Sequence, residues 1–324
     1  MEKILVSRTD GIGDLLLTTP LFNELKMKFP KARISALVSS YASPLLVNNP
    51  FVDDIIIYDA GQKDTAGMLK ERGFDAVLAV YPRPALAWDF FRAAIPLRYG
   101  TSSRWYSFLY NKRVKLSRKS SENHESDYNL MLANELIGEA RGQKEYYFIS
   151  DDERAAADAI LRSKGLNGGF IAVHPGSKGS AWNLSEAKYT QLTEALAAAG
   201  KKVLLTGGKQ EKDMIRRMAL KIARDSVHVL NEELGLREFA AVLGRADVLV
   251  SGSTGPMHIA AALGVKTASF FPPDSIPATA PRRWGPLGNI HEIIQPEGPG
   301  EKEELMETID TAAVLDKIIR LAGN

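Results

Sequence analysis

Short apolar runs alternate with longer amphipathic segments along the chain, and this alternation predicts an α/β fold built on parallel sheets. In the first half, the strand candidates end at polar or glycine-containing turns; they are 3–8, 33–38, 54–58, 74–80 and 96–100. Helix candidates follow at 15–29, 85–94, 126–137 and 150–161, and the last of these opens with Ser-Asp-Asp-Glu, a helix-start signal.

A second series of the same kind begins after Lys-Gly-Leu-Asn-Gly-Gly at 164–169, a polar, glycine-rich stretch that predicts a domain boundary. Its strands are expected at 170–174, 202–206, 226–230, 246–250 and 267–271, and its helices at 185–199, from 211, at 236–243, from about 256 and at 309–321. We expect domains at 1–163 and 168–308, with a C-terminal helix at 309–324 that is a candidate to pack back on the first domain. Two facing sheets would leave a central cleft at the carboxyl ends of their strands, where such folds bind ligands.

Composition narrows the protein class. The 324 residues are 45% hydrophobic and 25% charged with a net charge of +2, which is typical of a globular protein and argues against nucleic-acid binding as the main task. The absence of cysteine excludes disulfides, thiolate chemistry and zinc sites built on Cys. No run reaches the ~18 apolar residues of a membrane span, and the first residues lack a signal-peptide core. We therefore expect a cytoplasmic protein whose membrane contacts are peripheral.

The loop after the first strand, Thr-Asp-Gly-Ile-Gly at 9–13, leads into an apolar helix that begins with Asp14. Gly11 and Gly13 match the front of a dinucleotide-binding fingerprint, but Leu16 stands where the third glycine would be, so that fingerprint is not complete. Asp14 is either a helix N-cap or a catalytic base, with Asp10 as a second carboxylate nearby.

The stretch Ser251–Ala262 follows a buried-looking strand and opens a helix near Pro256, a residue suited to a first helical turn. Free N–H groups and the helix dipole favour an anion there, and Gly255 lets a phosphate approach the backbone. Ser253 and Thr254 add hydroxyl donors, with His258 one turn further on. The stretch predicts a diphosphate site; the alternative is a capped helix with a satisfied histidine.

Two other loops of the second half carry polar candidates. His-Pro-Gly-Ser-Lys at 174–178 offers N–H, hydroxyl and ammonium donors to a phosphate, or is a solvated turn. Glu211 follows Gly-Gly-Lys-Gln and either caps a helix or accepts hydrogen bonds from ribose hydroxyls. The five histidines show no metal-ligand spacing, so no metal site is predicted.

Residues 81–121 are one-sided in charge: they contain nine basic residues, and their only acid before Ser121 is Asp89. The basic residues are Arg83, Arg92, Arg98, Arg104, Lys112, Arg113, Lys115, Arg118 and Lys119, interleaved with Trp88, Trp105, Tyr106, Phe108 and Tyr110. Such a segment is either a solvated face or a surface for anionic sugars, nucleic acid or an acidic membrane. We take it as the place of an anionic acceptor in the first domain.

Together these motifs resemble glycosyltransferase family 9, the ADP-heptose:lipopolysaccharide heptosyltransferases. The resemblance rests on Asp-Gly-Ile-Gly-Asp at 10–14, Pro20, His-Pro-Gly-Ser at 174–177, Gly208 to Glu211, and Ser-Thr-Gly-Pro-Met-His at 253–258. It implies the two-domain GT-B fold with two Rossmann-like domains, an inverting mechanism, no tightly bound cofactor, and an ADP-sugar donor held by the second domain.

The resemblance also implies roles for single residues. Asp14 would be the general base that takes the acceptor proton, and Leu234 would pack on the adenine. The implied donor-binding residues are Ser177, Lys178, Ser180, Glu211, Leu234, Ser253, Thr254, Gly255, Pro256, Met257 and His258. The acceptor-binding residues would be Gly11, Ile12, Gly13, Arg83 and Arg104, and the acceptor a lipopolysaccharide-core or other anionic, lipid-linked glycan at the cytoplasmic face of the inner membrane.

Two positions depart from the family pattern. Many heptosyltransferases carry Asp where this chain has Ser253, and Lys where it has Ser180, although Lys178 lies two positions earlier. Both changes concern the donor's sugar and phosphates, so the sugar need not be heptose. A nucleotide-sugar epimerase of the same fold and a non-catalytic nucleotide-sugar-binding adaptor remain as alternatives.

Overall fold

The computed structural model describes residues 1–59, 61–116, 118, 121–177, 181–298 and 300–323. Internal contacts divide the chain into an N-terminal unit, 1–148, and a C-terminal unit, 149–324. The division falls earlier than the glycine-rich stretch at 164–169 predicted. The helix at 151–163 therefore belongs to the second unit, where it packs against a helix that begins at Leu236.

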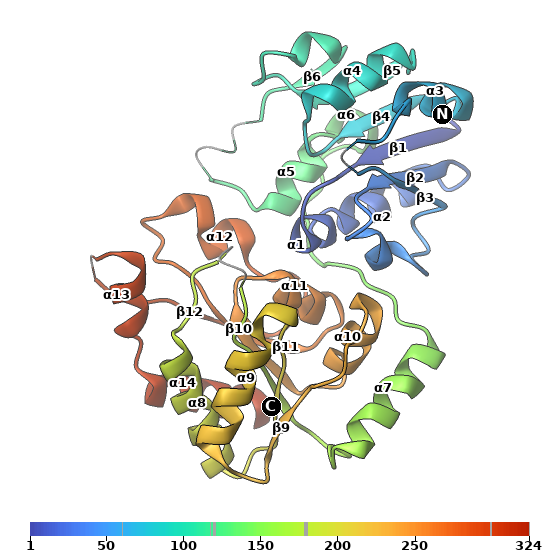
Figure 1. Ribbon diagram of the computed structural model, residues 1–324. Coiled ribbons are helices and arrows are strands. Elements are labelled where there is room, and N and C mark those ends of the chain that lie inside the picture. Colours follow the sequence, from blue (N-terminus) through green and yellow to red (C-terminus); the bar gives the residue numbers. More distant parts are fainter. Residues whose placement is uncertain (60, 117, 119–120, 178–180, 299, 324) are drawn as a thin grey trace. The chain divides into compact units, whose positions relative to one another are not determined.

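The N-terminal unit is built on one parallel sheet of six strands in the order β3-β2-β1-β4-β5-β6 (Figure 1). Its strands are β1 (Lys3–Ser7), β2 (Arg33–Val38), β3 (Asp54–Ile57), β4 (Ala76–Ala79), β5 (Leu97–Thr101) and β6 (Lys112–Val114). The central strands β1 and β4 are almost wholly buried, as expected where helices cover both faces of a sheet.

Helices connect these strands: α1 (Ile12–Leu16), α2 (Thr19–Lys28), α3 (Thr65–Arg72), α4 (Pro84–Arg92), α5 (Glu125–Met131) and α6 (Asn134–Ile137), with 3-10 turns η1 (Ser43–Leu46) and η2 (Ser107–Leu109). One sheet face packs Leu5, Leu37 and Val77 against α3, α4 and η2. The helix predicted at 15–29 is in fact two helices, and the one predicted at 126–137 is also divided.

The C-terminal unit repeats the design with a second parallel sheet in the order β12-β11-β10-β7-β8-β9. Its strands are β7 (Ile171–His174), β8 (Val203–Leu205), β9 (Val227–Val229), β10 (Val248–Gly252), β11 (Lys266–Phe270) and β12 (His291–Ile294). Its helices are α7 (Asp151–Ser163), α8 (Glu186–Ala198), α9 (Lys212–Ile222), α10 (Leu236–Leu243), α11 (Gly255–Ala262), α12 (Pro281–Trp284), α13 (Lys302–Glu307) and α14 (Thr311–Gly323), with η3 (Lys209–Glu211) and η4 (Pro277–Thr279).

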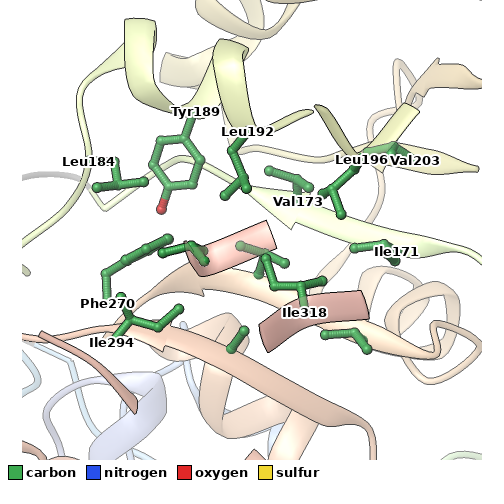
Figure 2. Packing of buried hydrophobic residues seen from close by; sticks show 14 of the residues in the cluster. Ile171, Val173, Leu184, Tyr189, Leu192, Leu196, Val203, Phe270, Ile294 and Ile318 are labelled. Carbon is green, nitrogen blue, oxygen red and sulfur yellow. The ribbon is translucent and has the colours of Figure 1, made fainter. Parts of the chain in front are cut away.

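The core of the C-terminal unit lies between its sheet and α8, α9 and α14. Figure 2 shows Tyr189, Leu192 and Leu196 of α8 packed over Ile171 and Val173, with Phe270 and Ile294 of the neighbouring strands and Ile318 of α14 in the same cluster. Lys266 Nζ also donates a 3.0 Å hydrogen bond to the Leu321 carbonyl. The C-terminal helix α14 is thus part of this unit's core. Among the helices of the described residues, none combines the length and apolarity that a membrane span requires.

Candidate functional site

A buried arginine organises the carboxyl end of β1. Arg8 is only 3% exposed, and its guanidinium contacts three carboxylates: Nε lies 2.7 Å from Asp10, Nη2 2.5 Å from Asp14 and Nη1 3.2 Å from Glu125. Asp14 lies in the short helix α1, and with 27% of its side chain exposed it is the most exposed of the three carboxylates. The arrangement fixes one Asp14 oxygen on Arg8.

The other two carboxylates, Asp10 and Glu125, contribute negative charge beside the Arg8 guanidinium. Burial raises the pKa of Asp10 to about 6, with the Asp14 charge adding to the rise and Arg8 opposing it. Arg118 Nε lies 3.1 Å from the buried Glu125, so a second cation joins the cluster. Three acids share two arginines, and Asp14 keeps the greatest access to solvent of the three.

Asn129 of α5 holds this cluster to the helices beside it. Its amide nitrogen donates to the Leu17 carbonyl at 3.0 Å and to Thr18 Oγ1 at 3.1 Å. Its oxygen accepts from Arg8 at 3.1 Å and from Arg118 at 3.2 Å. Both donor and both acceptor positions of the amide are in use, so Asn129 sets where α1 ends and how the two arginines lie.

Of the predicted acceptor residues, three directly precede Asp14 in the sequence and one contacts its loop. A Cβ on Gly11 would lie 2.9 Å from Asp14 Oδ2, so glycine lets the carboxylate lie over the loop. Gly13 is half-buried in α1, and Ile12 is a core residue. Arg83 Nη2 donates to the Thr9 carbonyl at 3.0 Å, which brings a cation to the Asp14 loop.

Arg104 is exposed, and its backbone N–H donates to Ser107 Oγ at 3.1 Å. The basic segment as a whole is only partly free to bind an anion. Arg98 bonds the carbonyls of Ile95 and Leu109, and Lys112 pairs with Glu135. Part of the basic segment is therefore used inside the folded unit, and its other basic residues remain the candidates for an anionic acceptor.

In the C-terminal unit, Glu211 lies against the loop after β7. It is 8% exposed, and its Oε2 has no hydrogen-bond partner among the described residues. A Cβ on Gly176 would lie 2.9 Å from both Cγ and Cδ of Glu211, and a Cβ on Gly207 would lie 2.9 Å from its Cβ. Two glycines thus make room for a buried carboxylate that retains an unused acceptor.

The predicted phosphate stretch begins where β10 ends. Thr254 is the N-cap of α11 with extended backbone, and its hydroxyl donates to the Gly252 carbonyl at 3.4 Å. Ser253, Gly255 and Pro256 are half-exposed. Met257 is different, because its side chain is fully buried and its N–H donates to Thr254; these are marks of a core residue.

Other predicted donor residues have mixed positions. His258 is 4% exposed, Leu234 and Ser177 are half-buried, and Lys178 and Ser180 lie outside the described residues. His174 Nδ1 lies 3.0 Å from Thr206 Oγ1, which ties the ends of β7 and β8 together. These loops follow neighbouring strands of one sheet, β10, β7 and β8, and so gather at its carboxyl edge.

Residues 65–309 match the family model described as glycosyltransferase family 9 (heptosyltransferase). The chain belongs to glycosyltransferase family 9. It is 32% identical over 94% of its length to a candidate glycosyltransferase of Haemophilus influenzae, of which it covers 92%. It is 24% identical to lipopolysaccharide heptosyltransferase 3 of Escherichia coli over 80% of each chain.

The solved structure of Escherichia coli ADP-heptose lipopolysaccharide heptosyltransferase II superposes with a TM-score of 0.82 at 20% identity, over 99% of this chain and 98% of that one. The fold of this family 9 chain is accordingly GT-B, as the motifs predicted, and the protein is a glycosyltransferase.

Four residues of this family 9 glycosyltransferase were not predicted as site residues from the sequence: Arg8, Glu125, Asn129 and Asn183. Asn183 donates to the Pro175 carbonyl at 2.5 Å and accepts from the Tyr189 hydroxyl, and a Cβ on Gly252 would lie 3.0 Å from its Oδ1. It therefore joins the loop after β7 to α8 and lies beside the end of β10. The one local signal was Arg8 itself, a charge directly after a buried strand.

Proposed function

We propose that this family 9 glycosyltransferase moves a heptose or a related sugar from an ADP-linked donor to a hydroxyl of a lipopolysaccharide-core or other anionic, lipid-linked glycan. The names of its relatives support this choice, since one is a lipopolysaccharide heptosyltransferase and another an ADP-heptose lipopolysaccharide heptosyltransferase. We further propose that it acts at the cytoplasmic face of the inner membrane, where such an acceptor would be anchored.

The observation that carries the mechanism is the Arg8–Asp14 pair. Arg8 holds one Asp14 oxygen at 2.5 Å while the side chain stays 27% exposed, so the other oxygen can accept a proton. In the proposed reaction Asp14 takes the proton of the acceptor hydroxyl as that oxygen forms its bond to the anomeric carbon. The bond from the anomeric carbon to the diphosphate breaks, and ADP leaves with the electron pair.

The donor's nucleotide would lie on the C-terminal unit. Glu211 would accept from the ribose hydroxyls through its unused oxygen, and Leu234 would pack on the adenine. Ser253, Thr254, Gly255 and His258, at the start of α11, would hold the diphosphate and stabilise its growing charge. These residues would bind the ADP-sugar as a donor substrate, which is consumed in each turnover. The proposed reaction therefore requires no tightly bound cofactor.

Asp14→Asn tests the mechanism, because it keeps the shape of the side chain and removes its basicity. We expect transfer to fall by about 10²–10⁴-fold, the usual contribution of a general base, with ADP affinity unchanged in a calorimetric titration. Asp316→Asn, an exposed change on α14, is the matched control. Full turnover by Asp14→Asn would refute the assignment.

The donor class needs a separate measurement. ADP should raise the melting temperature more than UDP, GDP or NAD at equal concentration, since a ligand that binds only the native state stabilises it more the lower its dissociation constant is relative to its concentration. Release of ADP that requires an acceptor would exclude an epimerase, which needs none.

A further inference from the structure

A cluster of exposed aromatic rings lies over α4 and η2 in the N-terminal unit. The side chains are Trp88 and Phe91 of α4, each 49% exposed, Trp105, 79% exposed, and Phe108 of η2, 66% exposed. Around them in sequence are four exposed cations: Arg92, Arg104, Arg113 and Lys115. We propose that this aromatic–basic surface docks the enzyme on an anionic phospholipid membrane.

The rings are carried by a rigid support. The inner sides of the same elements, Leu86 and Phe90 of α4 with Tyr106 and Leu109 around η2, are buried together in one core cluster. Trp88 and Phe91 stack at 5.8 Å between ring centroids with their planes 29° apart. The outward rings are therefore held in place by packing beneath them, and their exposure is a property of the folded unit.

Their position in the sheet keeps them together. The elements α4 and η2 pack against each other, and η2 also contacts β5 in the outer half of the sheet. Trp105 precedes η2 by two residues, and Arg98 connects α4 to η2, because its guanidinium lies 5.5 Å from the centroid of the Phe91 ring and donates to the Leu109 carbonyl. Monomeric proteins rarely leave several large aromatic side chains exposed on neighbouring elements without a partner.

The charges complement a membrane of negative headgroups. Of the nine basic residues between 81 and 121, the folded unit uses four: Arg83 at the Thr9 carbonyl, Arg98 at two carbonyls, Lys112 with Glu135 and Arg118 with Glu125. Arg92, Arg104, Arg113 and Lys115 form no ion pair with any described residue. These four are available to lipid phosphates.

Aromatic rings beside basic side chains match the two layers of a membrane interface. Trp and Phe rings enter the boundary between headgroups and acyl chains, and Arg and Lys attract anionic lipid from within a Debye length. A nucleic acid would contact the basic side chains, but the net charge of the whole chain is only +2, so the overall electrostatic attraction would be weak. The membrane is the partner that uses both features.

This inference rests on the proposed function in one respect: a lipid-linked acceptor explains why the enzyme would bind a membrane. The binding itself can be measured without acceptor or nucleotide. Failure of docking and failure of the transferase assignment are therefore separate results.

The test is co-sedimentation of the full chain with vesicles of phosphatidylglycerol and phosphatidylethanolamine, compared with pure phosphatidylcholine. We expect binding to the anionic vesicles, loss of that binding near 1 M salt, and a blue shift of tryptophan fluorescence as Trp105 leaves water. Trp105→Ser combined with Phe108→Ser should weaken partition about tenfold or more. Arg92→Glu combined with Arg113→Glu should do the same at low salt.

Met27→Ser combined with Leu220→Ser is the matched control, since these side chains are 74% and 79% exposed on α2 and α9. It should bind vesicles like the original chain. Equal binding by the aromatic variant and the control would overturn the proposal, as would absence of vesicle binding, preference for an oligonucleotide, or a dimer that buries Trp105. Transfer to a water-soluble acceptor fragment should be unchanged in the Trp105 and Phe108 variant.

Discussion

At the scale of single residues, the two candidate carboxylates, Asp14 of the N-terminal unit and Glu211 of the C-terminal unit, are held in different ways. The Asp14 carboxylate is oriented by charge, through an arginine that is 3% exposed. The position of the Glu211 side chain depends on steric room, because a side chain at Gly176 or Gly207 would overlap with it. Gly11 also leaves room for Asp14, but the ion pair with Arg8 anchors that carboxylate, whereas Glu211 forms no ion pair with the described residues. An added methyl group should therefore displace Glu211 more easily than Asp14.

Gly176→Ala tests this directly. The added Cβ would lie 2.9 Å from Glu211, closer than such atoms approach in folded proteins, so the carboxylate has to move. Losing one or two hydrogen bonds between a charged group and ribose corresponds to roughly a 10- to 100-fold weaker affinity for ADP. Titration calorimetry measures it.

Gly168→Ala is the control for that substitution, since a Cβ there meets nothing within 4 Å. An unchanged affinity for ADP in Gly176→Ala, with the protein folded, would remove Glu211 from the donor site.

At the scale of elements, local sequence predicts what local interactions decide. The helix at 236–243 was predicted to the residue, because an amphipathic run lies between Gly235 and Gly244. The helix at 15–29 was predicted whole, yet it divides at Leu17 and Thr18, where Asn129 inserts its amide. No pattern near position 17 reveals a partner that lies 112 positions away.

The same reason separates the site residues that sequence could find from those it could not. Glu211 and Ser253–His258 each lie in a glycine-containing loop directly after a predicted strand. This spacing is visible in the sequence, so both could be predicted as site candidates. Glu125 and Asn129 look like ordinary residues of a helix and become functional candidates only beside Arg8. The short edge strands β6 and β12 were missed because three or four residues show no clear alternation.

An ion pair between α7 and α10 gives a prediction about stability. Glu153 bonds Arg237 in two places, one at 2.7 Å, and closes the capping box with Ser150. The Arg237 hydrogen bond lowers the pKa of Glu153 to about 2 from 4.5. Because the folded pKa is the lower one, the stabilisation is complete above about pH 4.5 and is lost as the pH falls toward 2.

Glu153→Gln should accordingly cost about 2 kcal/mol of unfolding free energy at pH 7, and the difference from the original chain should shrink below pH 4.5. Denaturant unfolding followed by circular dichroism measures both. Asp152→Asn, one residue earlier and exposed, should cost less than about 1 kcal/mol. A pH-independent difference for Glu153→Gln would contradict the role of its charge.

At the scale of the whole molecule, the chain consists of two sheets with separate cores. One cluster joins β1, β2 and β4 to α3 and α4, and the other joins β7, β10 and β11 to α8, α9 and α14. Each of these two clusters is made of described residues of one unit, so we expect a ligand of one unit to stabilise mainly the residues of that unit.

Hydrogen exchange with and without ADP tests whether nucleotide binding stabilises the C-terminal unit alone. ADP at 100 times its dissociation constant should add about 2.7 kcal/mol of protection to the C-terminal unit, strongest at 174–177, 206–215 and 251–258. Residues 1–148 should change little. Equal protection in both units would show that nucleotide binding is not a property of the second unit alone, and GDP at the same concentration serves as the comparison.

Asn129 has a consequence for how the protein ages. Hydrolysis of an asparagine amide to a carboxylate exchanges one heavy atom and preserves the outline of the side chain. At this position it would put an oxygen opposite the Leu17 carbonyl, 3.0 Å away, and add a fourth acid to a cluster of two arginines. Deamidation here would thus disturb the hydrogen bonds around Arg8 and Asp14 while leaving the outline of the Asn129 side chain almost unchanged.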